Sequence, residues 1–488
     1  LIEAGGVDES FVHDRTTGTT TRVSVATGGR QASGDSYHPS ISADGRCVVF
    51  TSNAPDLDPA DGGGERDIYL HDRATGVTSL VSAGPNGFSP GGDSGTPQIS
   101  ADGWFVTFSS TAAGLVADDT NGVADVFVRD RIKRTTTRVS VGPGGAQAIG
   151  GVSDEPAISA SGRYVAFLSA ATNLVAGDAN GLRDVFLHDR LTQTTTRVSV
   201  GIGGTEPAGG GAWDVDLDRD GRLVAFTSMA SNLVAGDTNN TWDAFVFDRT
   251  AGTTTRVSVS NSGAQSNGLG QMSVSISADG RSVAFSSQGS TLVPLDTNNV
   301  YDIFVHDLSS RQTRRVSVTS DGEQSAGGVV ASFRPDISGD GRYVAFDSLA
   351  TNLSAGDANG VIDAFVRDTR MYPLTRASAQ LPGAPPLDAV HAQPAISADG
   401  RIVAFQSLAS NLVANDTNGV ADVFAFDRVT GITTRVSVSS AGAEANGASS
   451  QPSLSADGRY LAFLSAASNL VAYDVNIGDG DETFGHDV

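Results

Sequence analysis

Short runs of apolar residues, separated by glycine, aspartate and asparagine, recur along the whole chain of 488 residues. One copy, starting at residue 156, reads PAISASGRYVAFLSAATNLVAGDANGLRDVFLHDRLTQTTTRVSVG and contains four such runs: PAIS, RYVAFLS, DVFLHD and TTTRVSV. Each run is rich in Val, Ile, Phe or Thr and is bounded by turn residues, which is typical of β-strands. No helical periodicity interrupts them. The pattern predicts an all-β chain built from four-stranded units.

The turn between the first two runs, usually Asp-Gly-Arg, recurs at a nearly constant spacing. Its anchors lie 58 to 61 residues apart, at Asp44, Asp102, Ser161, Asp220, Asp279, Asp340, Asp399 and Asp457. Eight such units predict one β-propeller domain over residues 1–488, with eight blades of four antiparallel strands. A solenoid is the alternative, but solenoids need capping repeats with a polar outer face, and the sequence contains none.

The two ends of the chain are out of phase with this repeat. The N-terminus, ESFVHDRTTGTTTRVSV, supplies a third and a fourth strand, whereas the C-terminus supplies a first, a second and a third. We therefore expect the N-terminal fourth strand to complete the C-terminal blade and close the ring. Third-strand copies number nine, at Phe11, Tyr69, Phe127, Phe186, Phe245, Phe304, Phe365, Phe424 and Phe484. One terminal copy is therefore spare, displaced or paired with another molecule.

The repeated pattern PxIS-x-DGR-x-VAF-x-S … DVFVxD resembles the PD40, or WD40-like, repeat of TolB-type propellers over essentially the whole chain. The resemblance implies a secreted or periplasmic protein that binds other molecules. Some members of the family carry hydrolase or lyase sites. Typical TolB propellers have six blades, whereas the repeat count here is eight.

The amino-acid composition excludes some classes of binding partner and of bound metal. The chain has 55 acidic and 32 basic residues and a formal net charge of −23. Nucleic acid needs clustered Lys and Arg, so neither nucleic acid nor an anionic membrane surface is expected as a partner. Cys47 is the only cysteine, which excludes an intrachain disulfide and a Cys-based zinc site. No apolar run is long enough to span a membrane. The chain begins at Leu1, as a processed or trimmed chain would.

The turn between the second and third runs is acidic in almost every copy, with the motif D-x-N-G-x-x-D. Carboxylate and amide oxygens are the ligands that calcium prefers, and two carboxylates on one short loop repel each other without a cation. Calcium is therefore the predicted cofactor. The candidate ligands are Asp61 and Asp67; Asp119, Asn121 and Asp125; Asp178, Asn180 and Asp184; Asp237, Asn239 and Asp243; Asp296, Asn298 and Asp302; Asp357, Asn359 and Asp363; Asp416, Asn418 and Asp422; and Asp474 and Asn476. The alternative is a plain turn, because Asn-Gly is the strongest hairpin signal and Asp and Asn bond their own backbone in turns.

Most of the histidines occupy a single repeat position, directly before the Asp that ends the third run. They are His13, His71, His188, His306 and His486. Other copies place Arg or Phe at this position, so we interpret it as structural and not as a catalytic His–Asp pair.

A site for an asymmetric ligand must break the repeat, and the position six residues before each anchor does so. It holds His38, Thr96, Glu155, Asp214, Ser273, Arg334, Gln393 and Gln451, whereas a nearby apolar position is always Ile or Leu. In a propeller this position begins the innermost strand, at the channel mouth and on the face of the acidic loops. We therefore expect all of these residues except Ser273 to bind the ligand. Trp213 and Trp242 add an aromatic break in the fourth unit, suited to sugar stacking or to core filling. The alternative is drift at solvated channel positions.

The sequence thus predicts a secreted or periplasmic binding or scaffold propeller, stabilised by calcium, with a protein or glycan partner at the channel mouth. One alternative is a carbohydrate-active hydrolase or lyase, in which Glu155, Asp214, Arg334 and His38 would serve acid, base and electrostatic roles. The sequence contains no nucleophile elbow, phosphate loop or His-metal cluster, so binding is favoured over catalysis. The other alternative is a structural protein that self-assembles through the spare third strand and is not a monomer.

Overall fold

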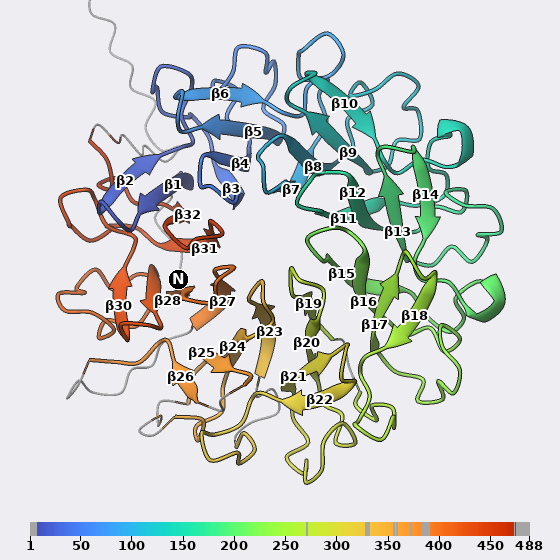
Figure 1. Ribbon diagram of the computed structural model, residues 1–488. Coiled ribbons are helices and arrows are strands. Elements are labelled where there is room, and N and C mark those ends of the chain that lie inside the picture. The colour runs from blue at the N-terminus through green and yellow to red at the C-terminus, as the bar shows by residue number, and fades with distance from the viewer. Residues whose placement is uncertain are drawn as a thin grey trace, which may run out of the picture.

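The fold is a ring of eight four-stranded antiparallel sheets around a central channel (Figure 1). The structure is a computed structural model, and it describes residues 7–269, 272–326, 332–354, 357, 360–370, 373–381, 391–472 and 474. The eight-bladed propeller predicted from the repeat is confirmed. Among the described residues, no helix has the length and apolar character needed to cross a membrane.

The innermost strands line the channel, and we number blades 1 to 8 in their order: β3 (Ser36–Ile41), β7 (Ser94–Ile99), β11 (Ser153–Ile158), β15 (Ala212–Leu217), β19 (Val274–Ile276), β23 (Ser332–Ile337), β27 (His391–Ile396) and β31 (Ser449–Leu454). The second strands are β4 (Cys47–Ser52), β8 (Phe105–Ser110), β12 (Tyr164–Ser169), β16 (Leu223–Ser228), β20 (Ser282–Ser287), β24 (Tyr343–Ser348), β28 (Ile402–Ser407) and β32 (Tyr460–Ser465).

The third strands are β5 (Asp67–Asp72), β9 (Asp125–Asp130), β13 (Asp184–Asp189), β17 (Asp243–Asp248), β21 (Asp302–Asp307), β25 (Asp363–Asp368), β29 (Asp422–Asp427) and β1 (Glu9–Asp14). The outermost strands are β6 (Val77–Leu80), β10 (Thr135–Arg138), β14 (Thr194–Arg197), β18 (Thr253–Arg256), β22 (Gln312–Arg315), β26 (Leu374–Arg376), β30 (Ile432–Arg435) and β2 (Thr19–Arg22). Two short 3-10 turns, η1 (Pro143–Gly145) and η2 (Ile202–Gly204), lie in the connectors that follow blades 2 and 3.

The second and third strands form the core because each blade packs between two neighbours. Both faces of these strands are therefore buried, and their sequences read as continuous apolar runs. In every blade an aromatic ring of the second strand stacks on one of the third, with centroids 5.5 to 6.0 Å apart. Residues of adjacent blades mix in each core cluster; for example, Ala166 and Leu168 of blade 3 pack with Phe226 of blade 4.

A closed ring of backbone hydrogen bonds joins the blades at the end of the channel where the Asp-Gly-Arg turns lie. The residue before each anchor takes part, and the N–H of Ala43 donates to the carbonyl oxygen of Ala101 in the next blade at 3.1 Å. The same bond is repeated from blade to blade until Ala456 donates to Ala43 at 3.0 Å. In blade 5 the carbonyl that accepts is on Ala278, whereas the N–H that donates is on the next residue, Asp279.

The ring is closed by both N-terminal strands. β1 pairs antiparallel with β32 from Glu9 opposite Ser465 to Asp14 opposite Tyr460, and β2 pairs with β1. Closure by the N-terminal fourth strand is confirmed, and the N-terminal third strand enters the same blade. The C-terminal third-strand copy, with Phe484 and His486, lies outside the described residues.

Replacing Phe11 by Ala should lower the free energy of unfolding by about 3–5 kcal/mol, the usual loss for truncating a buried aromatic ring. Phe11 is fully buried and stacks on Phe463 across the closure at 5.8 Å. Urea denaturation measures the loss. The control is Phe88→Ala, at a side chain that is 55% exposed, where we expect a change within about 0.5 kcal/mol. Equal effects of the two substitutions would contradict closure through β1.

Candidate functional site

The innermost strands open at the channel mouth with a β-bulge. In blade 1 the pairing register with β4 shifts between Tyr37 and Ser40, and the same shift occurs in most other blades. Six of the eight residues at the varied position have left-handed backbone, with φ between 48° and 56°: His38, Thr96, Glu155, Arg334, Gln393 and Gln451. Each of these six precedes a proline, whereas the other two, Asp214 and Ser273, precede valine.

Proline suits the bulge in six blades, whereas blade 4 has the same register shift with Val215 at that position. A bulge leaves one residue of the strand unpaired, and proline has no N–H group to leave without an acceptor. Left-handed backbone costs a residue other than glycine roughly 1–2 kcal/mol. The turns between third and outermost strands adopt similar angles, and there the chain uses glycine in four blades, at Gly18, Gly76, Gly252 and Gly431. At the mouth no blade uses glycine. Side chains are thus kept at the mouth against the backbone preference, which is a feature of functional sites.

Five of the seven predicted residues surround one cavity of about 500 Å³ at the mouth. They are His38, Thr96, Glu155, Gln393 and Gln451, with the prolines that follow them. Burial raises the pKa of the Glu155 carboxyl, and the nearby charge of Asp154 adds to the effect. Burial lowers the pKa of His38. The cavity therefore presents amides, a hydroxyl, an imidazole and a carboxyl from five different blades.

Side chains around the mouth also tie neighbouring blades together. The N–H of His38 donates to Oε1 of Gln451 at 3.0 Å, across the junction between blades 8 and 1. The N–H of Gln393 donates to Oδ2 of Asp347 at 3.1 Å, across the junction between blades 6 and 7. The varied mouth residues thus also help to hold the ring.

The two other predicted residues, Asp214 and Arg334, line a separate recess of about 290 Å³ in blades 4 to 6. Its wall contains Trp213, Met272, Tyr301 and Phe333. Of these four residues, only Trp213 was singled out from the sequence. The repeat could have indicated Met272 and Phe333 as well, because both stand, like Trp213, one residue before the varied position. Trp242 packs against the core between blades 4 and 5, so its role is core filling.

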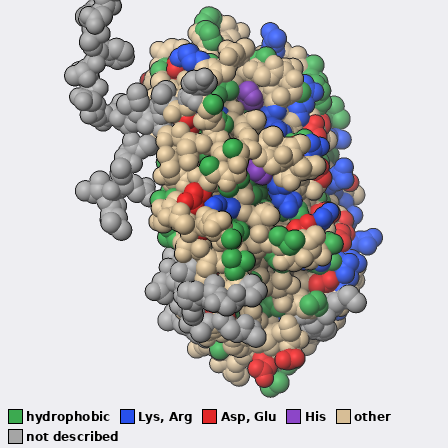
Figure 2. Space-filling model, turned by 90° about the vertical axis from the view of Figure 1, so that its left-hand side faces the viewer, with side chains coloured by type: hydrophobic (Ala, Val, Ile, Leu, Met, Phe, Trp, Pro, Cys, Tyr) green, Lys and Arg blue, Asp and Glu red, His purple; other side chains and the backbone are tan. Residues whose placement is uncertain are grey.

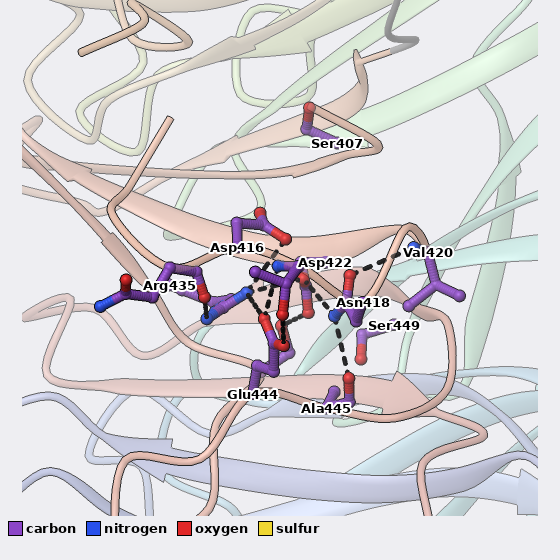
Figure 3. A network of polar contacts seen from close by, with 12 residues as sticks. Ser407, Asp416, Asn418, Val420, Asp422, Arg435, Glu444, Ala445 and Ser449 are labelled. Atoms are coloured by element: carbon purple, nitrogen blue, oxygen red, sulfur yellow. Dashed lines mark hydrogen bonds and ion pairs between the residues drawn. The ribbon is translucent and has the colours of Figure 1, made fainter. Parts of the chain in front are cut away.

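The acidic loops bind an arginine of their own blade. In blade 7, Nη1 of Arg435 lies 3.2 Å from Asp416 and 3.3 Å from Asp422, and Glu444 is 3.0 Å away (Figure 3). The arginine ends the outermost strand TTTR, and all of these side chains except Glu444 are nearly buried. The same arrangement joins the loop carboxylates to Arg138, Arg197, Arg256, Arg315, Arg376 and Arg22 in blades 2 to 6 and 8.

Blade 1 lacks the arginine and compensates for the loss. Leu80 stands in place of the arginine, and the third-strand aromatic is Tyr69 instead of Phe. The Tyr69 hydroxyl donates to Asp61, and Asp67 accepts hydrogen bonds from Ser82 and Ser89. Burial raises the pKa of Asp67 to about 6. A hydroxyl thus supplies the hydrogen bond that the guanidinium makes elsewhere.

The position of the arginine affects the prediction that the acidic loops bind calcium. The guanidinium occupies the space between the two carboxylates, so a calcium ion there would have to displace it. The loop asparagine turns its nitrogen toward the carboxylate: Nδ2 of Asn418 donates to Asp422 at 2.8 Å and to the Ala445 carbonyl at 2.9 Å (Figure 3). Among the described residues, no three His, Cys, Asp or Glu side chains come together as a metal site. Asn359 and Asn476 lie outside the described residues. Calcium stays a prediction, to be tested by thermal unfolding of metal-stripped protein with calcium, magnesium or chelator.

The repeated histidines hold adjacent blades together. His188 is buried, and its Nδ1 contacts the hydroxyl of Thr195 at 3.1 Å, which in turn donates to the carbonyl of Val141 in blade 2 at 2.6 Å. His13, His71 and His306 repeat the contact. Burial lowers the pKa of each of the four imidazoles to about 4, so they are neutral at physiological pH. His486 lies outside the described residues.

Ion pairs recur on the face of the Asp-Gly-Arg turns. Six turn arginines, Arg46, Arg163, Arg222, Arg342, Arg401 and Arg459, each bind the Asp that ends the third strand, at 2.7–2.8 Å. In the side view, Lys and Arg side chains gather toward one of the two faces of the disc, at the right of the picture (Figure 2). These exposed pairs contribute little stability individually.

No family model matches the sequence, and no curated protein matches it. Solved structures with a similar fold include one of two prolyl endopeptidases, with 13% identity and a TM-score of 0.49 over 82% of this chain and 49% of that one. A putative TolB from Agrobacterium tumefaciens has 14% identity and a TM-score of 0.34 over 64% of this chain and 89% of that one. The β-propeller domain of the Trilobed protease from Pyrococcus furiosus has 11% identity and a TM-score of 0.45 over 82% of this chain and 95% of that one. The chain thus spans about half the length of the endopeptidase. These neighbours are TolB and other propeller proteins, and at this similarity they carry no argument about family, ligand or activity.

Replacing Arg435 by Met should lower the free energy of unfolding by about 3–5 kcal/mol at neutral pH, because it leaves buried carboxylates without a cation. Burial, together with the charge of Asp422, already raises the pKa of Asp416 to about 6. Without Arg435 that pKa rises further, so in the variant protonation removes the unpaired charge at a pH above 6. The loss of stability should therefore be full at alkaline pH, shrink as the pH falls toward 6, and be small at pH 5. Urea denaturation at several pH values measures it.

The matched control is Arg401→Met. Arg401 also binds an aspartate, Asp427, at 2.7 Å, but its side chain is 49% exposed. We expect a loss of at most about 1 kcal/mol. If the two variants lose the same stability, or if the Arg435 effect does not depend on pH, the arginine is not the cation that the loop requires.

Proposed function

We propose that this propeller is a binding protein whose ligand occupies the channel mouth. The observation that carries the proposal is the left-handed, non-glycine residue that six blades place there, with a different side chain in most of them. A merely structural position of that backbone angle would favour glycine. The outer turns use glycine in four blades and other residues, Arg134, Gln193 and Arg311, in three, whereas the mouth uses glycine in none. The position three residues after the varied one stays Ile or Leu in every blade, so the variation belongs to the polar side chains around the mouth and not to the core of the strand.

A secreted or periplasmic setting belongs to the same proposal. It is supported by the resemblance of the repeat to TolB-type propellers. Binding is favoured over glycan cleavage because the mouth cavity brings together one carboxyl, Glu155, with amides and a hydroxyl, whereas Asp214 lies in the separate recess. An enzyme of the hydrolase type needs two carboxyl groups across one bond.

The test is a pair of double variants that relieve the same backbone strain at two places. Glu155→Gly with Gln393→Gly removes two mouth side chains, and Gln193→Gly with Arg311→Gly removes two side chains from outer turns of similar φ, 59° and 56°. Both doubles should gain stability, by roughly 0.5–1 kcal/mol per position. Peptide and glycan arrays probed with the native protein should identify a ligand. Only the mouth double should lose it, with an affinity at least tenfold weaker.

The proposal is overturned if the arrays give no ligand for the native protein, or if both doubles bind the ligand as the native protein does. Turnover of an array glycan by the native protein, lost in the mouth double, would instead support the hydrolase or lyase alternative.

Self-assembly is a second candidate function, and a sequence match favours it. Residues 481–487 read DETFGHD and residues 8–14 read DESFVHD, and these are the two third-strand copies with Glu where all others have Asp. The residues that anchor β1 are therefore duplicated: Glu9 binds Arg22 at 2.8 Å, and Asp14 binds Arg459 at 2.8 Å. Val12, which is fully buried, has Gly485 as its counterpart, so the C-terminal copy would bury less apolar surface in the same slot.

Deletion of residues 482–488 tests this candidate. If the C-terminal copy exchanges between molecules, the deletion should convert an oligomer to a monomer in light scattering, with thermal stability of the propeller unchanged. An unchanged mass in solution contradicts the candidate.

A further inference from the structure

The mouth is divided into two chemically different halves. The position just before the varied residue is apolar and large in three consecutive blades, as Trp213, Met272 and Phe333. Together with Tyr301 these side chains form the wall of the recess in blades 4 to 6. The five remaining blades surround the polar cavity described above. A ligand that fills the mouth therefore meets amides and hydroxyls on one side and an apolar wall on the other.

Arg334 is the cation of the apolar half. It is exposed, and its guanidinium lies 5.8 Å from the centre of the Phe333 ring. In the described part of the chain no acidic side chain lies within ion-pair distance of Arg334. Its acidic neighbour is Asp347, a carboxyl whose pKa burial raises to about 8 and the charge of Arg334 lowers only in part, so Asp347 does not neutralise the guanidinium near neutral pH. The other two arginines of the mouth are paired, Arg66 with Asp93 at 3.1 Å and Arg183 with Asp154. On a protein with a net charge of −23, an unpaired arginine at the edge of an apolar recess is suited to an anionic ligand.

Asp214 and the two serine hydroxyls of the recess are already engaged with the protein. Asp214 accepts the N–H of Val274 at 3.0 Å, and the hydroxyls of Ser273 and Ser286 contact each other at 3.1 Å. A sugar needs partners for several hydroxyls, whereas an aromatic ring needs apolar and aromatic surface. Trp213 offers that surface, since its side chain is 52% exposed. The wall therefore favours an aromatic ring over a sugar.

We propose that the recess binds an aromatic carboxylate, such as the C-terminal aromatic residue of a peptide. The ring packs against Trp213, Tyr301 and Phe333, and the carboxylate forms an ion pair with Arg334. This inference rests on the proposed function of the mouth, because the recess and the polar cavity lie side by side around the same opening. The rest of the ligand would extend over Gln393 toward the polar half.

The test uses N-acetylphenylalanine, its amide, N-acetylalanine and glucuronate, measured by calorimetry and by the fluorescence of the exposed Trp213. Native protein should bind N-acetylphenylalanine more tightly than the other three. Arg334→Gln should weaken the binding of N-acetylphenylalanine roughly 10- to 100-fold, as expected for the loss of a charged hydrogen bond. It should leave the affinity for the amide unchanged. Gln already occupies the same left-handed position in blades 7 and 8, so this variant keeps the local backbone. Trp213→Ser, with the residue that blade 8 has there, should weaken both phenylalanine compounds.

The proposal is overturned if N-acetylphenylalanine does not bind native protein at millimolar concentration, if Arg334→Gln leaves its affinity unchanged, or if glucuronate binds more tightly. These failures are distinguishable from failure of the proposed function. Suppose that an array ligand no longer binds the Glu155 and Gln393 double variant but still binds Arg334→Gln. The proposal that the mouth is the binding site would then stand, and only the proposal of an aromatic carboxylate would fail. The control for charge is Arg281→Gln, on the opposite face, which should change no affinity.

Discussion

Closure of the ring is the constraint on which the rest of the structure depends. Each blade buries both faces of its central strands against its two neighbours, so a single missing neighbour would expose two apolar faces. The closed circle of N–H···O bonds at the Asp-Gly-Arg end fixes the distance between successive innermost strands, with donor–acceptor distances of 2.9–3.1 Å all the way round. The final junction uses chain segments more than 440 residues apart, β1 against β32. The mouth is formed at the other end of the same eight strands, and its width follows from the circle below it.

Buried charge in the blades is balanced locally. An acidic protein of this kind could hold its paired loop carboxylates with an external cation, but in seven blades an arginine from the outermost strand lies between them. The guanidinium fits this role because its fork of N–H groups can serve two carboxylates at once. It also links the loop after the second strand to the outermost strand, so the blade is braced across its width. Blade 1, which has no such arginine, gives Asp61 a hydrogen bond from the Tyr69 hydroxyl instead.

The mouth combines a symmetric backbone with asymmetric chemistry. The same bulge occurs in seven blades and turns one residue of each toward the opening, so side chains that differ from blade to blade are presented in similar positions. In six blades that residue is held in the left-handed region, and the following proline removes the donor that the bulge would otherwise leave unpaired. Blades 4 to 6 add large apolar residues one position earlier. The mouth therefore has an apolar side and a polar side, although the backbone is nearly the same in every blade.

The sequence by itself determined the strand pattern, the number of blades and the position of the variable residues, because each depends on local periodicity and on spacing along the chain. It also determined that the ring closes through the N-terminus, since the two ends are complementary fragments of one repeat. Which terminal third strand fills the last blade was decided only by the tertiary structure, because both copies carry the same anchoring residues. The partner of the acidic loops was likewise decided in three dimensions: Arg435 follows Asp416 by 19 residues, and the spacing of the motif contains no sign that the two meet. The division of the mouth into a polar and an apolar half also needed the fold, because it arises from residues of several blades that only the closed ring brings together.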